Sequence, residues 1–325
     1  MRALDLHGLK IATVPNSIDK LTYLKYLDLS KSDIEVLPSS FIRLLNLQTI
    51  KLTGCGKLKE LPRDIKKLVN LEHLEIDGCK SLTHMPCGLG QLTSLQTLQL
   101  FVVSKELAVF PSKRCGELAE LNKLNNLRGE LCIKNLAWVK DATSEAKATN
   151  LKEKQHLREL DLSWDWEDND GVDVCDDENL LNGLEPHHTL KKLYVEGYRG
   201  VRFPTWLSTL TSIVKLKISV SMCQHLPPLY QLWSLQNLNL RRMIGLEYIS
   251  DQEITDEVST STTSFPSLES LILWSFPNLK GWWRRDIVDV ATTTSTSSDQ
   301  YQQHIYLPYF PRLSYLCIVD CSNLT

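Results

Sequence analysis

The sequence lacks any apolar run close to the roughly 18 residues that a membrane-spanning helix requires, although 42% of its residues are hydrophobic. Its first residues do not form the charged, apolar and cleavage regions of a signal peptide, and Met1–Leu6 alternates like a short strand instead. Basic residues are not in excess, because 36 Lys and Arg face 39 Asp and Glu and the net charge is −3. We therefore expect a soluble chain with no membrane span and no nucleic-acid partner.

Cysteines are present but do not form the pattern of a disulfide framework. The nine cysteines are an odd number with irregular spacing, which favours reduced thiols and a cytoplasmic location. Cys55, Cys79 and Cys321 each follow the last leucine of a short motif by three residues. We expect these thiols to be buried and reduced, although Cys55 and Cys79 could in principle be close enough for a disulfide.

Motifs for catalysis and metal binding are also missing. The chain contains no G-x-S-x-G, H-E-x-x-H or C-x-x-C. Gly54–Lys57 lacks the spacing of a phosphate-binding loop and is better explained as a turn. The pair His187–His188 and the acidic stretch Asp165–Glu178 do not follow the ligand order of a known metal site. The sequence therefore predicts no enzyme, no cofactor and no metal.

One pattern, however, recurs at a nearly constant distance. The motif L-x-x-L-x-L, with Ile allowed at the leucine positions, begins at Leu24, Leu47, Leu71 and Leu95. A proline recurs in parallel, at Pro15, Pro38, Pro62 and Pro86. Both series have steps of 23, 24 and 24 residues, which indicates an internal repeat. Period and motif are those of a leucine-rich repeat.

Each motif predicts a short strand with one buried face, because side chains alternate along a strand. A single coil cannot bury its leucines alone, so neighbouring coils must stack. Proline cannot donate to a sheet and should lie on the other side of the coil. The predicted fold is an α/β leucine-rich-repeat solenoid, a curved horseshoe with a parallel sheet on the concave face and loops and short helices on the convex face. A helical bundle would tolerate the prolines badly.

Further copies of the motif follow, so residues 1–325 are expected to form one domain of about twelve irregular repeats. Leu131-x-Ile133 is a weaker copy, and the later copies begin at Leu157, Leu190, Ile213, Leu235, Leu268 and Leu313. Insertions are expected near residues 101–126, 139–156, 165–178, 250–264 and 286–306. The first two have helical patterns, and the third should be a solvated acidic loop. Within the last two, the tracts Thr255–Ser264 and Ala291–Gln303 are Ser/Thr-rich and should be disordered. Neither end has a polar capping coil, which suggests part of a longer protein.

Several irregular segments closely resemble the plant intracellular immune receptors of the coiled-coil, nucleotide-binding, leucine-rich-repeat class. The segments that carry the resemblance are Glu117–Ile133, Gly183–Leu193, Gly197–Trp206, Leu226–Leu232 and Phe265–Leu268. The resemblance covers essentially the whole chain but only the repeat region of such receptors. Their nucleotide-binding domain and coiled coil are not in this sequence.

The resemblance implies recognition of proteins without catalysis. In that family the repeat domain restrains the nucleotide-binding module, and it senses a pathogen effector or a host protein that the effector has modified. The expected partners are therefore such an effector or guarded host protein, and the nucleotide-binding domain of the full-length receptor. The alternative is a generic leucine-rich-repeat scaffold or adaptor unconnected to immunity, which would keep the same coils but would not need the family-like insertions.

The alternation also predicts which side chains face a partner. Positions three, five and seven of the motif should point out of the concave sheet, and in the fourth copy they include Phe101. This face should gain lysines and Arg241 in its middle and become aromatic towards the end of the chain. Exposed aromatics beside arginine are typical anchors of protein interfaces. We therefore predict that Tyr194, Lys217, Arg241 and Trp274 carry partner recognition; alternatively, Trp274 packs under the Ser/Thr-rich insertion.

Overall fold

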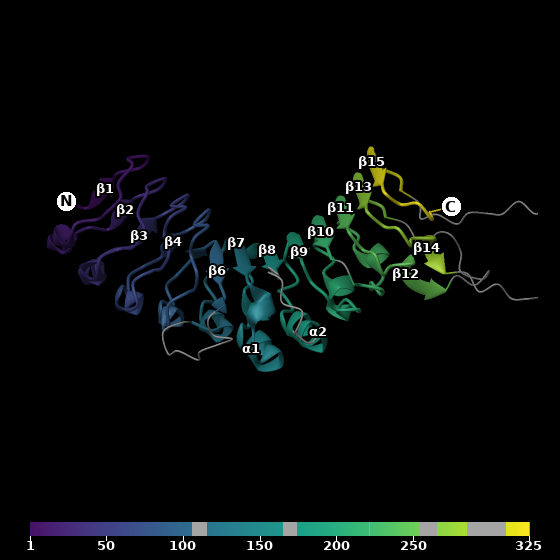
Figure 1. Ribbon diagram of the computed structural model, residues 1–325, viewed down its shortest axis with the longest axis horizontal. Helices are drawn as coiled ribbons and strands as arrows, with labels where there is room; N and C mark the ends of the chain where they lie inside the picture. The colour runs from purple at the N-terminus through teal and green to yellow at the C-terminus, as the bar shows by residue number, and fades with distance from the viewer. Residues whose placement is uncertain (106–115, 165–173, 221, 254–264, 285–309, 325) are drawn as a thin grey trace, which may run out of the picture.

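The computed structural model describes residues 1–105, 116–164, 174–220, 222–253, 265–284 and 310–324. They form a curved solenoid whose coils each place a strand on the inner side of the arc and a loop or short helix on the outer side (Figure 1). The two ends of the chain lie at opposite ends of this arc. The predicted α/β leucine-rich-repeat solenoid is confirmed.

The strands on the inner side form two parallel sheets. The five-stranded sheet contains β1 (Ala3–Asp5), β2 (Tyr26–Asp28), β3 (Thr49–Lys51), β4 (His73–Glu75) and β5 (Thr97–Leu98). The eight-stranded sheet contains β6 (Leu100–Val102), β7 (Gly129–Lys134), β8 (Leu157–Ser163), β9 (Lys192–Glu196), β10 (Lys215–Ser219), β11 (Asn237–Arg241), β13 (Ser270–Trp274) and β15 (Tyr315–Val319). A separate pair joins β12 (Tyr248–Glu253) to β14 (Gly281–Arg284).

The core is a stack of equivalent leucine positions. Leu27 pairs with Ile50, Ile50 with Leu74 and Leu74 with Leu98 along the sheet, and none of the four is more than 1% exposed. Burial of this kind contributes roughly 1.5–3 kcal/mol per side chain. Since every coil repeats the arrangement, the core runs as one continuous layer through the arc.

Short 3-10 helices cover much of the outer side. They are η1 (Asn16–Lys20), η2 (Ser39–Arg43), η3 (Ile65–Lys67), η4 (Leu89–Gln91), η6 (Leu118–Leu121), η7 (Leu136–Trp138), η8 (Leu151–Glu153), η9 (Thr205–Thr209) and η10 (Leu229–Gln231). Pro15 and Pro38 directly precede η1 and η2, where a missing N–H costs no helix hydrogen bond. The predicted placement of the repeated proline away from the strands is therefore correct.

The two sheets are separated where the alternation of the fourth motif changes phase. Leu98 pairs with Leu74 and points into the core, so strict alternation would turn Phe101 outward. Phe101 instead pairs with buried Ile133 and is 0% exposed. The prediction that Phe101 belongs to the concave face is therefore wrong. A shift of one residue between Leu98 and Phe101 turns both side chains inward, and the sheet is divided at this point.

Two α-helices lie on the outer side of the middle coils (Figure 1). Helix α1 (Ala142–Ala148) is the helix expected within residues 139–156, and Asp141 caps it by accepting a hydrogen bond from the backbone N–H of Ser144. Helix α2 (Val174–Gly183) packs against α1. It includes residues 174–178, for which we predicted a solvated acidic loop, and that prediction is wrong for these five residues. The remaining part, 165–173, lies outside the described residues.

Helix α2 forms where it does because buried indole and carboxylate groups hold it. The indole Nε1 of Trp164 donates to Asp177 Oδ1 at 3.0 Å, and both side chains are buried. Burial raises the pKa of Asp177 to about 6, although the hydrogen bonds that its carboxylate accepts lower the pKa in part. Glu178 Oε1 accepts the backbone N–H groups of Val201 and Arg202 at 2.7 and 3.1 Å. The family-like segment Gly197–Trp206 thus has a structural role as the partner of α2.

Cys55 and Cys79 occupy the turn positions that the repeat predicts. Each thiol lies near the backbone carbonyl of the preceding coil, Cys55 Sγ 3.2 Å from Leu29 O and Cys79 Sγ 3.2 Å from Leu52 O. Both are free and at most 2% exposed. Burial, followed by the proximity of Cys55, raises the pKa of Cys79 to about 12, so this thiol is unreactive near neutral pH.

The Ser/Thr-rich insertions are only partly described. Strand β12 extends into the first of them, since residues 250–253 pair with β14. Residues 254–264 and the whole of the last insertion, 286–306, lie outside the described residues.

Candidate protein-binding surface

The outward side chains of the inner strands form rows that cross the sheet, because parallel strands pair in register. Tyr194 on β9 pairs with Lys217 on β10, and Lys217 pairs with Asn239 on β11. In the next row Arg241 on β11 pairs with Trp274 on β13. The four predicted site residues therefore lie on four adjacent strands, with two residues in each of two neighbouring rows. We call this set the recognition patch: Tyr194, Lys217, Arg241 and Trp274.

Arg241 and Trp274 form its best-defined pair. The guanidinium carbon of Arg241 lies 5.4 Å from the Trp274 ring centroid, within the range of a cation–π contact. Arg241 Nε also donates to Asn239 Oδ1 at 2.9 Å. Trp274 remains 44% exposed. The pair therefore presents a charged group and an indole surface whose relative positions are held before any partner binds.

Tyr194 and Lys217 form the other half of the patch. The ammonium of Lys215 lies 5.6 Å from the Tyr194 ring centroid, so this ring is also beside a cation. Burial and then Glu159 raise the pKa of the Tyr194 hydroxyl, which keeps it protonated. Lys217 lies near Asp161 of the same row, whose pKa is raised by burial and by Glu196.

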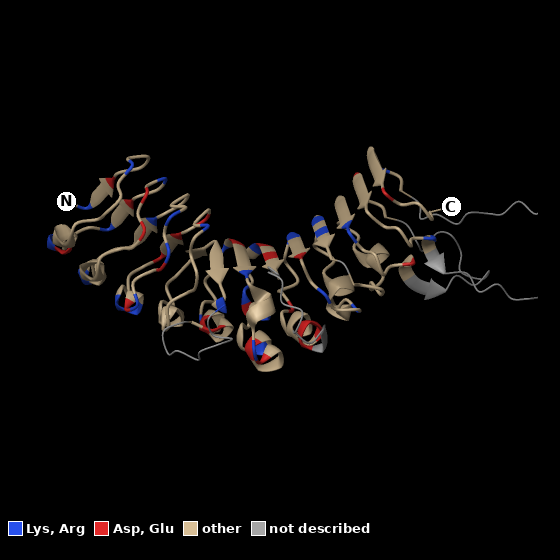
Figure 2. Cartoon of the chain, in the orientation of Figure 1, with Lys and Arg blue, Asp and Glu red and all other residues tan. Residues whose placement is uncertain are grey.

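The sign of charge changes across the middle of the arc (Figure 2). Glu159 and Asp161 lie on β8, whereas Lys215 and Lys217 lie on β10 and Arg241 on β11. Beyond them the outward residues become apolar and aromatic, with Ile272, Trp274 and Tyr315 on β13 and β15. The predicted change from charged to aromatic character therefore follows the order of the strands.

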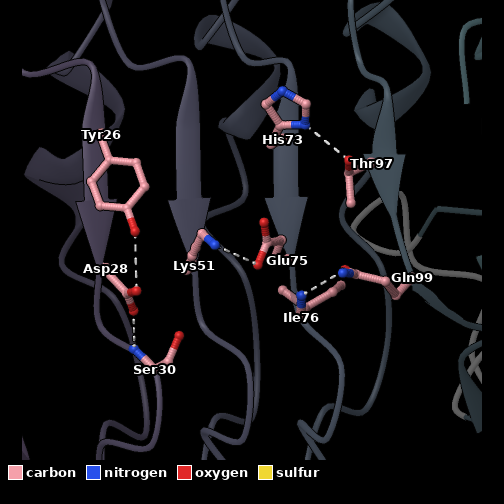
Figure 3. Close-up of polar contacts among 9 residues, drawn as sticks. All are labelled: Tyr26, Asp28, Ser30, Lys51, His73, Glu75, Ile76, Thr97 and Gln99. Carbon is pink, nitrogen blue, oxygen red and sulfur yellow. Dashed lines mark hydrogen bonds and ion pairs between the residues drawn. The ribbon is translucent and has the colours of Figure 1, made fainter. Parts of the chain in front are cut away.

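The concave face of the five-stranded sheet is different, because its polar side chains mostly bind one another (Figure 3). Tyr26 donates to Asp28 at 3.2 Å, and the backbone N–H of Ser30 donates to Asp28 at 2.8 Å. Burial acts to raise the pKa of Asp28, but hydrogen bonds from Ser30 and Tyr26 outweigh it and lower the pKa. Figure 3 also shows the ion pair of Lys51 and Glu75 at 3.2 Å.

Two further polar contacts lie at the β4 and β5 end of this concave face. His73 Nδ1 lies 2.8 Å from Thr97 Oγ1, and Gln99 Oε1 accepts the backbone N–H of Ile76 at 3.3 Å (Figure 3). Polar groups that are already satisfied gain less from a new partner. The recognition patch is therefore the stronger candidate for a protein interface.

Sequence reasoning missed one group on this side of the molecule. The predicted concave face contains positions three, five and seven of each motif, whereas Arg128, Arg158 and Lys191 occupy position two, directly after the first leucine. The signal was present as a basic residue at one repeat position in three successive copies.

The alternative in which Trp274 packs beneath the Ser/Thr-rich insertion concerns residues outside the described ones. Within the described part of the chain, no cluster of three His, Cys, Asp or Glu side chains is arranged to hold a metal ion. Every helix in that part is too short or too polar to span a bilayer.

Comparisons with known proteins point to one family. The family described as R13L1/DRL21 LRRs matches residues 118–243. A disease resistance RPP13-like protein from Arabidopsis thaliana is 39% identical over 100% of this chain and 30% of its own length. The disease resistance protein RGA2 from Solanum bulbocastanum is 37% identical over 58% of this chain and 19% of its own length. The chain thus spans less than a third of the length of either relative.

Among solved structures, an internalin from Listeria monocytogenes is similar, with a TM-score of 0.48 and 16% identity over 97% of this chain and 86% of that one. The match to the R13L1/DRL21 family includes the middle coils, with α1 and α2, and part of the recognition patch. The relatives named above are plant disease resistance proteins. The chain belongs to the plant nucleotide-binding leucine-rich-repeat disease resistance proteins and corresponds to their leucine-rich-repeat region.

Proposed function

We propose that this chain is the non-catalytic recognition region of a cytoplasmic plant immune receptor, and that it senses a pathogen effector or a host protein modified by one. The observation that carries the proposal is the recognition patch, above all the exposed Trp274 held against Arg241 at 5.4 Å. Tryptophan and arginine are the residue types that most often dominate the free energy of protein association.

The position of the patch supports the same function. It lies on the inner side of the arc, where a solenoid can surround a partner with several coils at once. Its middle is basic and its end apolar, so a partner would combine carboxylates with an apolar side chain. A patch arranged before binding loses less conformational entropy when the complex forms.

A second role within the same receptor is restraint of the nucleotide-binding module. The support for it is the resemblance to full-length disease resistance proteins, of which this chain spans 30% in the RPP13-like relative. The restraint would require contact between the solenoid and that module. It can be tested by co-purifying this chain with the separately expressed nucleotide-binding portion.

The recognition patch can be tested by comparing immobilised parent and variant chains. Extracts of infected and uninfected leaves would be passed over the parent, Arg241→Ala and Trp274→Ala, and retained proteins would be quantified by mass spectrometry. A protein retained by the parent only from infected tissue would be purified and its affinity measured. We expect each of Tyr194→Ala, Lys217→Ala, Arg241→Ala and Trp274→Ala to weaken that affinity by more than about 1 kcal/mol.

The control is Trp233→Ala, since Trp233 is 59% exposed but lies in the turn before β11 rather than on the inner strands. It should bind like the parent. All variants should melt within a few degrees of the parent, because the substituted side chains are outside the leucine core. Unchanged affinity in all four patch variants would show that the partner uses another surface.

A further inference from the structure

The second residue of each motif forms a row along the rim of the sheet, at the start of the strands. In the five-stranded sheet, three successive residues of this row bind one another. Gln48 Nε2 donates to Glu72 Oε1 at 3.3 Å, and Gln96 Nε2 donates to Glu72 Oε2 at 3.4 Å. The single carboxylate of Glu72 thus accepts hydrogen bonds from both neighbours, which satisfies the side chains of these three residues.

The same row continues into the eight-stranded sheet with three cations. The backbone N–H of Arg128 donates to Gln96 O at 2.8 Å, and that of Lys191 donates to Arg158 O at 2.9 Å. Arg128, Arg158 and Lys191 are all exposed. They line one hollow of about 470 Å³ at the beginning of β7, β8 and β9. We call these three residues the rim cations.

The rim cations have no acidic partner in the described part of the chain. Arg158 Nη1 donates only to the backbone carbonyls of Gln155 and Thr189, at 3.2 and 3.4 Å, and Lys191 Nζ donates to the carbonyl of Ser212 at 3.3 Å. None of the three forms an ion pair there, whereas exposed lysines elsewhere in the fold do so repeatedly.

The two carboxylates that line the hollow do not neutralise this charge. Glu159 already forms an ion pair with Lys192 at 2.8 Å. Glu130 is therefore the one other carboxylate among the described lining residues that could balance the charge of the three rim cations. Burial, then Glu159 and Asp77, raise the pKa of Glu130. Nearby, His187 has a lowered pKa because of burial and then His188, with Arg158 and His156 contributing in the same direction.

The backbone of Lys191 bonds to that of Arg158, and like charges at neighbouring positions of a sheet destabilise it, so these two cations work against the stability of the isolated chain. Arg128 lies on the next strand, across a register shift between β7 and β8. From this we infer that the hollow at the start of β7–β9 is a docking site for an acidic segment of a protein partner, whose carboxylates bind Arg128, Arg158 and Lys191. The rim cations are not members of the recognition patch, because they occupy position two of the motif on the rim. The hollow also reaches the concave face, where Glu159 and Lys192 line it.

The geometry favours an extended acidic peptide over other anions. The three cations lie on three adjacent strands about 4.8 Å apart, with Arg128 offset by the register shift between β7 and β8. Successive carboxylates of one extended chain can therefore reach them. A single phosphate could reach only some of these cations. The hollow has no aromatic side chain in its described lining, and single-stranded nucleic acids usually need one for base stacking.

The test uses the full chain and two fluorescent peptides, hexaglutamate and hexaglutamine, followed by anisotropy at about 50 and about 200 mM salt. We expect hexaglutamate to bind, hexaglutamine not to bind, and the affinity to fall at the higher salt. Arg128→Gln/Arg158→Gln/Lys191→Gln should bind hexaglutamate at least about tenfold more weakly. It should melt no earlier than the parent, since it removes mutual repulsion.

The matched control is Lys20→Gln/Arg63→Gln/Lys123→Gln, which removes the same charge from three exposed residues on separate coils. It should keep the parent's affinity within about twofold. Equal losses in both triple variants would show that only net charge matters and would overturn the proposal. Binding of an oligouridylate through the rim cations, with no binding of hexaglutamate, would also overturn it and indicate nucleic acid instead.

Discussion

In the five-stranded sheet, four strands have three residues and the last has two, and their motifs recur every 23 or 24 residues. In the eight-stranded sheet most strands have five to seven residues, and the spacing between motifs is irregular. Both sheets cover the same continuous leucine core. The two regions therefore differ in what surrounds the core and not in the core itself.

The surroundings differ most in their polar groups. In the first region polar side chains lie on the concave face or the rim and bind one another, as Gln48, Glu72 and Gln96 do. In the second region, charged groups are also found inside. Lys154 is 0% exposed and directly follows η8. The equivalent residues after η3 and η4 are leucines, Leu68 and Leu92. Asp177 is 3% exposed and is held by Trp164.

In the region with the regular period, equivalent side chains of successive coils make the same contacts. In the region with the irregular period, the insertions depend on contacts that particular residues make. Insertions in the second region must be attached to the solenoid, and Trp164, Glu178 and Lys154 make these attachments through hydrogen bonds. The second region also has the rim cations, which lack an acidic partner among the described residues, and the exposed indole of Trp274. The region with the less regular repeat therefore has the candidate binding sites.

The largest expected effect tests whether the core is common to both regions. Leu74→Ala in the first region and Leu238→Ala in the second should each lower the free energy of unfolding by about 2–5 kcal/mol, because each removes a buried side chain and leaves a cavity. Both residues are at most 1% exposed. Val69→Ala is the control, since Val69 is 61% exposed, and it should cost less than about 0.5 kcal/mol. Equal losses for Leu74→Ala and Val69→Ala in urea titrations would contradict the repeat register.

A smaller effect, of opposite sign, should distinguish the regions. Burial lowers the pKa of Lys154 to about 8, and its ammonium donates to Leu121 O at 2.7 Å. That carbonyl also accepts the backbone N–H of Leu124, so Lys154→Met leaves it satisfied and removes a buried charge. We expect Lys154→Met to stabilise the chain by about 1 kcal/mol at neutral pH.

The pH dependence gives this prediction a second readout. Between pH 8 and 10.5 the unfolded chain holds the Lys154 proton more tightly than the folded chain does, so the parent gains stability as the pH rises through this window. The advantage of Lys154→Met should therefore shrink between about pH 7 and pH 10. Lys123→Met, at an exposed position, should show no such trend. An advantage that did not change with pH would argue against a charged buried amine.

The smallest effect concerns the polar face of the first region. Lys51 and Glu75 form an ion pair at 3.2 Å, with side chains 32% and 24% exposed. A double-mutant cycle with Lys51→Ala and Glu75→Ala should give a coupling free energy of about 0.2–1 kcal/mol. The coupling should weaken in about 1 M salt because the pair is partly solvated. A coupling well above this range would mean that the concave face of the first region is a major source of stability.

Much of the fold follows directly from the sequence, because the leucine period defines both the coil and the alternation of each strand. For the same reason, the outward direction of Tyr194, Lys217, Arg241 and Trp274 could be predicted from their motif positions, and in-register pairing places them on adjacent strands. Their role in binding remains a proposal. These features depend on local spacing, which a single sequence contains.

Other features were decided only by tertiary structure. Phe101 turns inward because the chain shifts phase where the two sheets meet, and residues 174–178 are helical because Trp164 and the segment after β9 hold α2 in place. The rim cations line one hollow only because coils about 30 residues apart stack side by side, with a register shift between β7 and β8. The repeat specifies how each coil is built, but contacts between residues distant in the sequence decide how insertions attach and which charges become neighbours.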